Sequence, residues 1–252
     1  MVNFICTEDE IEAGKRAAEI MAEVIKNKAN ATLGLATGST PINMYGELVK
    51  MYKRGEISFA KVKSVNLDEY VGLSGEHNQS YAFFMRRHLF SLIDIKEENT
   101  HIPNGISIDS SEECRRYDNL LDSLGDVDIQ LLGIGHNGHI AFNEPNSHFP
   151  KDTSVVELTN STVNANSRFF TSEKDVPSQA ISMGIGRILR AKRILLLATG
   201  EKKAKILEES LFGNVTPAVP ASILQFYQGE LTVLGDKASF SEIIKKHPET
   251  VI

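Results

Sequence analysis

The chain of 252 residues carries 27 basic and 33 acidic side chains, and its formal charge of −6 argues against a nucleic-acid surface, which concentrates Lys and Arg. Its length suits one large α/β domain spanning residues 1–252, and it contains no run of about 18 apolar residues that could cross a membrane. Because the first ten residues lack the features of a secretion signal and two cysteines cannot form a disulfide framework, we expect a cytoplasmic protein.

The hydrophobic pattern predicts alternating helices and strands. Residues 9–28 carry apolar side chains at helical spacing, and the apolar run 31–36 predicts a buried strand. Thr40 is then expected to cap a helix that begins at Pro41. The later elements are predicted as a strand at 62–67, helices at 80–93 and 110–125, a strand at 126–135, a helix at 178–192, a strand at 193–198, a helix at 201–213 and a strand at 230–236. This alternation predicts an open, mainly parallel sheet with helices on both faces, a Rossmann-like three-layer α/β architecture.

Four polar stretches, TGST, DEY, GHNGH and TGEKK, each follow directly after a predicted strand. In an open parallel sheet, the carboxyl ends of the strands lie along one edge, where ligands bind. We therefore expect the four stretches to form a single site.

The stretch LLGIGHNGHIAFNEP, residues 131–145, admits several interpretations. Residues 133–138 fit a dinucleotide-binding pattern, but the following Asn-Glu-Pro interrupts the long helix that a pyrophosphate site requires. His136 and His139 could bind a metal together with Glu144, although the turn-prone Asn-Gly pair between the histidines would point their rings apart. His139 and Glu144 could instead form an acid/base pair, or His139 could be a hydrogen-bonded core histidine. The nearby glycines favour a close approach of the backbone to a ligand.

The segment LATGSTP, residues 35–41, has the features of a phosphate site, because free N–H groups and the positive end of a helix dipole meet there. It lacks the GK[ST] ending of a P-loop, and the alternative is a tight turn with a helix cap. Candidate cations for the phosphate are Arg168 and Lys203. Candidate loop ligands are Thr37, Gly38, Ser39 and Thr40.

Asp68 and Glu69 are adjacent carboxylates at the end of the strand predicted at 62–67. Successive side chains of an extended segment point to opposite sides, so at most one of the two is expected to face a cleft. Asp68 could also serve only to cap a helix or a turn.

The segments GLATGSTP, VNLDEYVGL, GIGHNGHIAFNEP and NANSRFF, in this order and at these separations, resemble the glucosamine-6-phosphate deaminase (isomerizing) family over nearly the entire chain. The resemblance implies that D-glucosamine 6-phosphate and water give D-fructose 6-phosphate and ammonium, without a cofactor or a metal. It implies that His139 opens the sugar ring and that Asn137 and Glu144 hold the His139 side chain in place. It also implies that Asp68 carries a proton from C2 to C1. The loop 37–40 and the two candidate cations would bind the phosphate.

The sequence departs from the family at two places. Many members have Asp at the position of Asn137, and an amide can orient His139 but cannot stabilise an imidazolium by charge, so we expect a different pH dependence of ring opening. Regulated members have basic residues where this chain has Ser154 and Val156. We therefore expect a non-allosteric enzyme, either a monomer or a homo-oligomer.

Two rival functions are compatible with the same fold. A 6-phosphogluconolactonase has a similar histidine loop but does not need Asp68 as a base towards carbon, and FNEP fits the deaminase pattern better. A sugar-phosphate sensor would bind the same ligand without turnover. The fold cannot separate these functions, so the residues of the site must do so.

Overall fold

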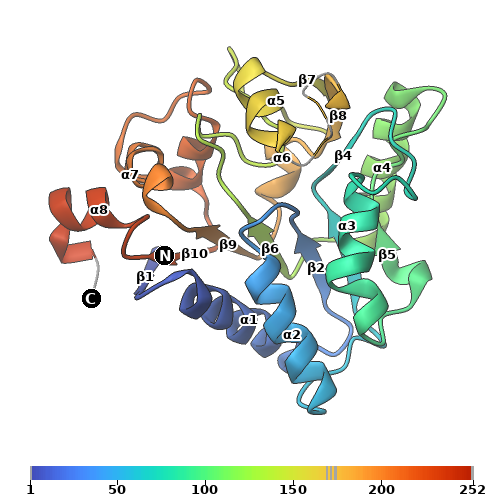
Figure 1. Cartoon of the computed structure of the whole chain (residues 1–252), viewed down its shortest axis with the longest axis horizontal. Helices are drawn as coiled ribbons and strands as arrows, with labels where there is room; N and C mark the ends of the chain where they lie inside the picture. Colours follow the sequence, from blue (N-terminus) through green and yellow to red (C-terminus); the bar gives the residue numbers. More distant parts are fainter. Residues whose placement is uncertain (1, 169, 171, 173–174, 251–252) are drawn as a thin grey trace.

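A computed structural model describes residues 2–168, 170, 172 and 175–250, and its centre is a parallel sheet (Figure 1). In sheet order the strands are β1 (Val2–Thr7), β10 (Glu230–Asp236), β9 (Arg193–Ala198), β6 (Ile129–Leu132), β2 (Thr32–Leu35), β3 (Lys63–Asn66) and β5 (Thr100–His101). Every pair of neighbours in this sheet is parallel. The predicted parallel sheet is therefore confirmed, with a further strand, β1, at one edge.

Helices lie on both faces of this sheet, as predicted. They are α1 (Glu10–Asn27), α2 (Ile42–Lys53), α3 (Tyr81–His88), α4 (Ser110–Leu124), α5 (Asn160–Ser167), α6 (Ile185–Ile188), α7 (Ala204–Phe212) and α8 (Ser241–Lys246). Short 3-10 helices are Phe90–Leu92, Glu97–Asn99, Glu201–Lys203, Pro220–Phe226 and Pro248–Thr250. Helix α1 packs against α2 and against strands β1, β10 and β9. None of the described helices is long and apolar enough to cross a bilayer.

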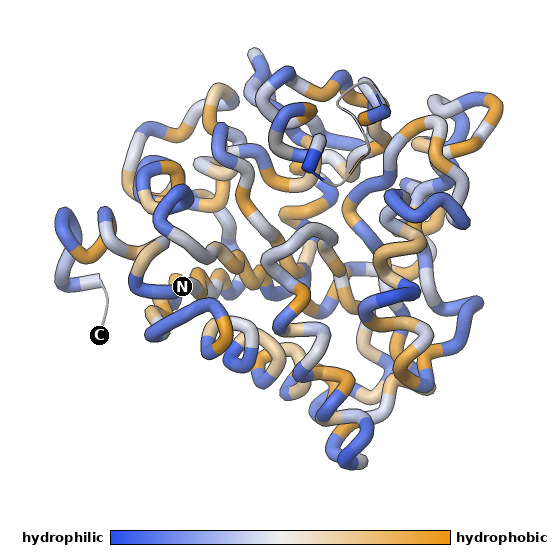
Figure 2. The backbone as a smooth tube through the Cα atoms, in the orientation of Figure 1, coloured by the Kyte–Doolittle hydropathy of each residue, from blue (hydrophilic) through white to orange (hydrophobic). Residues whose placement is uncertain are grey.

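The core follows the pattern of apolar residues in the sequence. Strands β2 and β6 are buried along their whole length, and hydrophobic stretches run through the centre of the molecule while polar segments lie mainly at its periphery (Figure 2). Strands that are covered on both faces need apolar side chains at every position rather than at alternate ones. This explains why continuous apolar runs marked these strands.

A second, smaller sheet lies beyond the carboxyl ends of the central strands, together with α5 (Figure 1). It is antiparallel, with the order β4 (Asp68–Tyr70), β8 (Gln179–Ser182) and β7 (Ser154–Glu157). Asp68 pairs with Ser182 in this sheet. The DEY stretch is therefore not a loop: it is strand β4 of the small sheet, and the chain passes into it directly from β3 of the main sheet.

Several predicted elements are wrong in detail. The helix expected at 80–93 ends at His88, and a separate 3-10 helix follows at Phe90–Leu92. The helix expected at 178–192 is strand β8 followed by the four-residue α6, because Gln179–Ser182 pairs with strands on both sides. Gly184, between β8 and α6, has no room for a side chain, because an added Cβ would lie 2.3 Å from the backbone oxygen of Asp152, just before β7. Thr40 does not cap α2, which begins at Ile42 without a side-chain cap.

Candidate active site

Strands β9, β6, β2 and β3 are neighbours in the sheet, and the four polar stretches that follow them meet at its carboxyl edge. They line a cleft of about 1000 Å³. The predicted site residues that line this cleft are Thr37, Gly38, Ser39, Thr40, Asp68, Asn137, His139, Arg168 and Lys203. Glu144 is buried and contacts His139 rather than lining the cleft. The structure thus brings all ten predicted site residues together.

His139 and Glu144 lie on one tight turn after β6. The Nδ1 atom of His139 is 3.5 Å from Oε2 of Glu144. Asn137 contacts both residues: its Nδ2 donates to Oε2 of Glu144 at 2.5 Å, and its Oδ1 accepts from the backbone N–H of His139 at 3.2 Å. Ala141, which lies between His139 and Glu144 in the chain, has a φ of 53°, in the left-handed region that non-glycine residues seldom adopt. This backbone conformation forms part of the turn between His139 and Glu144. Asn137 therefore fixes the geometry of the pair, as an amide can.

Two threonines at the start of α5 complete the surroundings of Glu144, and no local pattern in the sequence marks them. The hydroxyl of Thr162 donates to Oε1 of Glu144, and the hydroxyl of Thr159 donates to Oε2 at 3.3 Å. Burial raises the pKa of the Glu144 carboxyl, but contact with His139 and hydrogen bonds from Thr162 and Asn137 outweigh burial, so the pKa is lowered. Glu144 is therefore held as a carboxylate beside the imidazole.

The alternative interpretations of residues 131–145 find less support. An isolated bridge between Ile140 and Asn143 shows a turn where a dinucleotide site would need a helix. In the part of the chain that the structure describes, no three His, Cys, Asp or Glu side chains come together to hold a metal ion. A Cβ at Gly135 would lie 2.3 Å from Cε1 of His139, so this glycine accommodates the imidazole itself rather than a ligand.

Asp68 reaches the cleft from β4, and its side chain is almost completely buried. Burial raises the pKa of its carboxyl well above the usual range, and the charge of Glu69 raises it further. Glu69 does not line the cleft and instead accepts hydrogen bonds from the backbone at the start of α3. The prediction that at most one of the two faces the cleft is confirmed, and the capping role considered for Asp68 belongs to Glu69.

The cleft also carries two cations, Arg168 and Lys203. Lys203 donates from Nζ to the backbone oxygen of Ile134 at 2.5 Å. Burial lowers the pKa of Lys203 to about 8, and the nearby charge of Arg168 adds to this effect. The loop 37–40, with Gly38 at a φ of 103°, lines the cleft just before α2. Two cations beside a helix N-terminus form a suitable environment for a phosphate dianion.

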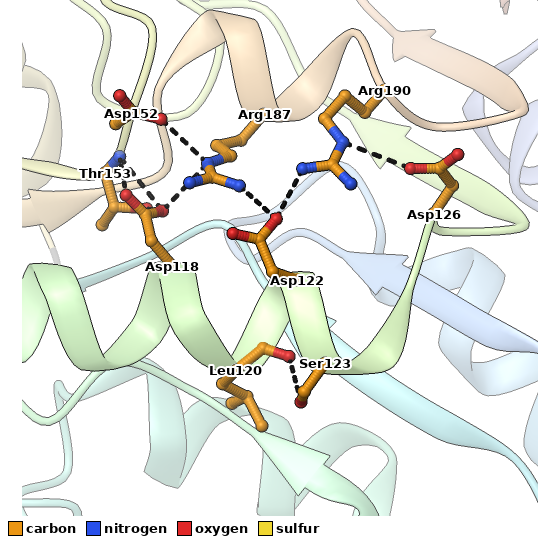
Figure 3. A network of polar contacts seen from close by, with 9 residues as sticks. All are labelled: Asp118, Leu120, Asp122, Ser123, Asp126, Asp152, Thr153, Arg187 and Arg190. Atoms are coloured by element: carbon orange, nitrogen blue, oxygen red, sulfur yellow. Dashed lines mark hydrogen bonds and ion pairs between the residues drawn. The ribbon is translucent and has the colours of Figure 1, made fainter.

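An ion-pair network connects the segment before β7 of the small sheet with helices α4 and α6 (Figure 3). Arg187 contacts Asp118 and Asp122 of α4 and Asp152 before β7, at 3.3, 2.6 and 3.0 Å. Arg190 also contacts Asp122, at 2.6 Å. The network joins α4, α6 and the segment that enters β7. It therefore ties the small sheet, which carries Asp68, to a helix of the main sheet.

Comparisons with known proteins agree with this geometry. A sequence model of the family described as glucosamine-6-phosphate isomerases/6-phosphogluconolactonase matches residues 9–233. A glucosamine-6-phosphate deaminase of Thermoanaerobacter sp. (strain X514) is 51% identical over 242 residues, which cover 96% of this chain and 95% of the relative.

Two solved structures are similar as well. One, described as a monomeric glucosamine-6-phosphate deaminase, is 44% identical with a TM-score of 0.92, and the match covers 95% of this chain and 99% of the other. A 6-phosphogluconolactonase from Trypanosoma brucei, 19% identical with a TM-score of 0.73 over 98% of this chain and 99% of the other, shares the fold. The chain belongs to the family of glucosamine-6-phosphate isomerases and 6-phosphogluconolactonases.

Proposed function

We propose that this chain is a glucosamine-6-phosphate deaminase, which converts D-glucosamine 6-phosphate and water into D-fructose 6-phosphate and ammonium. The observation that carries the proposal is the position of Asp68, a buried carboxyl on the same cleft as the pair of His139 and Glu144. A lactone hydrolase needs no base towards carbon, whereas an isomerase does. The similarity to two proteins described as glucosamine-6-phosphate deaminases supports the same choice.

In this proposal the phosphate is bound by the positive part of the cleft. Residues 37–40 line the same cleft as Arg168 and Lys203, and together these groups offer a dianion several charge-assisted hydrogen bonds. Binding at this end orients the sugar and places C1 and C2 towards Asp68 and His139. A fixed orientation makes proton transfer effectively intramolecular.

His139 is the proposed acid/base group for ring opening. It takes the proton from the C1 hydroxyl and returns a proton to the ring oxygen, which gives the open-chain aldehyde. Glu144 is ionised beside the imidazole and can stabilise its protonated form by charge. The neutral amide of Asn137 contributes orientation only.

Asp68 is the proposed base for isomerisation. It removes the proton from C2 while O1 takes up a proton from the substrate's ammonium group, which gives an enolamine with a hydroxyl on C1 and the amino group on C2, and it returns the C2 proton to C1. The product is an iminium ion at C2, which water cleaves to fructose 6-phosphate and ammonium. A buried carboxyl with a raised pKa is a stronger base once ionised, as this step requires.

The test is ammonium release from D-glucosamine 6-phosphate, combined with proton exchange at C1 of fructose 6-phosphate in heavy water, followed by NMR. Asp68→Asn keeps the shape but removes the base, so turnover is expected to fall by roughly 10² to 10⁴ with substrate still bound and exchange lost. Asp94→Asn is the matched control, because Asp94 accepts a hydrogen bond from the backbone N–H of Phe59 and does not line the cleft. Wild-type exchange in Asp68→Asn would refute the assignment. Hydrolysis of 6-phosphogluconolactone without ammonium release would favour the rival function.

We further propose that residues 1–252 act as one catalytic domain, as a monomer in the cytoplasm. The family match over residues 9–233 supports one domain, the relative described as monomeric supports the monomer, and two free cysteines fit a reducing compartment. Sedimentation analysis tests the monomer, and a dimer that persists on dilution would contradict it.

A further inference from the structure

Glu69 is adjacent to the proposed base but points away from the cleft into the protein. Its side chain is only 2% exposed. Oε1 accepts from the backbone N–H groups of Tyr70 and Tyr81, and Oε2 accepts from that of Ala82, each at 2.9 Å. Tyr81 and Ala82 are the first two residues of α3, so Glu69 satisfies N–H groups that a helix leaves without partners at its start. A carboxylate also interacts favourably with the helix dipole there.

The residue that Glu69 holds belongs to the wall of the cleft. Tyr81 lines the cleft, and its ring stacks on Phe142 with 5.8 Å between centroids and 11° between planes. The Tyr81 hydroxyl also lies 3.5 Å from that of Tyr70, and it interacts with Thr37 of the proposed phosphate loop. A displacement of the start of α3 would therefore move the wall between the proposed phosphate loop and the turn that carries His139.

Glu69 also places a negative charge next to Asp68. Burial raises the pKa of Glu69 to about 7, against the opposing effect of its three backbone hydrogen bonds and of Arg86 on α3. The pKa of Asp68 is raised by burial first and by Glu69 second. Three tyrosines face this pair, and burial together with the charge of Asp68 raises the pKa of each. They are Tyr70 of β4, Tyr81 of α3 and Tyr117 of α4.

We propose that Glu69 is a positioning residue for the isomerisation, which holds Tyr81 in the wall of the cleft and keeps a negative charge beside Asp68. This inference rests on the proposed function. The neighbouring charge opposes ionisation of Asp68, so the ionised carboxylate binds a proton more strongly. Glu69 thereby makes Asp68 a better base towards C2 without touching the substrate.

The variant Glu69→Gln removes the charge and keeps the size of the side chain. The acid limb of the kcat/KM profile is expected to move to lower pH by roughly one unit, as when a like charge beside a carboxyl is removed. The plateau of kcat is expected to fall about threefold, because the base is weaker. Glu69→Ala also removes the acceptor of the N–H groups of Tyr81 and Ala82 and should raise KM. An acid limb at the wild-type pH in Glu69→Gln would overturn the proposal, since a merely structural residue would leave it there.

Glu113→Gln is the matched control, because Glu113 is also a buried glutamate that accepts from a backbone N–H, that of Asn104, but does not line the cleft. Its pH profile should be that of the wild type. A shift equal to that of Glu69→Gln would show that the effect is not local to Asp68.

A second measurement does not depend on the folding of any Glu69 variant. Glu69 can raise the pKa of Asp68 only if Glu69 is already ionised when Asp68 titrates, so in the wild-type protein the carboxyl carbon-13 resonance of Glu69 should titrate at lower pH than that of Asp68. An Asp68 resonance that titrates first would overturn the proposal. Lack of ammonium release by the wild-type protein would instead refute the proposed function, and the titration distinguishes the two failures.

Discussion

Replacing Lys203 by methionine is expected to stabilise the fold while weakening substrate binding. Burial and the charge of Arg168 lower the pKa of Lys203 from 10.5 to about 8. Because one pKa unit is about 1.4 kcal/mol, keeping this lysine charged in the folded state costs about 3 kcal/mol. Methionine removes that penalty but also removes the hydrogen bond to Ile134, which is worth about 1 to 2 kcal/mol. The net gain in the free energy of unfolding should be about 1 to 2 kcal/mol.

The pH dependence of this gain identifies its cause. Below pH 8 Lys203 is protonated in both the folded and the unfolded state, so the penalty is fully present. Between about 8 and 10.5 the folded state has lost the proton and the unfolded state still binds it, so the wild-type protein gains stability with rising pH. Above 10.5 both states are neutral and the penalty is absent. The advantage of the variant should therefore be greatest below pH 8 and fall towards pH 10.5.

Urea unfolding at pH 7 and at pH 10 measures this difference, and steady-state kinetics measure binding. Loss of a charge-assisted contact to the phosphate should weaken binding by roughly 1.5 to 3 kcal/mol, seen as a higher KM. Lys205→Met is the control, because Lys205 lies two residues further along, is exposed and does not line the cleft. A Lys203→Met protein that is less stable than the wild type by the same amount at both pH values would show that burial of the charged lysine carries no such cost.

Three further predictions concern the turn and the regulation of the enzyme. Gly135→Ala should displace the ring of His139 and lower kcat more than it changes KM, as steady-state kinetics would show; unchanged kcat would mean that the ring has room to move. Thr162→Val removes a hydrogen bond to Glu144 and should raise the pKa of that carboxyl and lower kcat by roughly tenfold; an unchanged pH profile would contradict this role. Initial rates should follow a hyperbola in substrate and should not respond to N-acetylglucosamine 6-phosphate, whereas sigmoidal rates that this compound straightens would reveal an allosteric site.

The main sheet could be predicted from the sequence because its strands are buried on both faces. Thr32–Leu35 and Arg193–Ala198 appear in the sequence as continuous apolar runs, each followed by a polar turn, and parallel topology places those turns at one edge. The strand Gln179–Ser182 was mistaken for a helix because it is short and followed by a true helical turn. Its pairing partners, Asp68–Tyr70 and Ser154–Glu157, lie far away in the sequence, and local patterns do not record such pairing.

The sequence predicted which residues of the candidate site would lie together, but it did not predict their contacts. Asp68, His139 and Glu144 stand in distinctive segments at strand ends, which marked them in advance. Thr162 reaches Glu144 from 18 residues further along the chain, on a short polar helix without a clear apolar face. The cap that Glu69 provides likewise joins residues more than ten positions apart. Such contacts depend on tertiary packing, and a single sequence contains no local signal for them.

The arrangement of the site on four neighbouring strands has an evolutionary consequence. The proposed phosphate-binding groups follow β2, β9 and α5, while Asp68 follows β3 and the His139 turn follows β6. Each strand end can therefore acquire substitutions or a new loop while the others keep their positions. Loss of Asp68, which follows β3, would leave the groups that bind the phosphate of a sugar in place. If the phosphate-binding segments and the catalytic segments change independently, one family can contain both isomerases and lactonases.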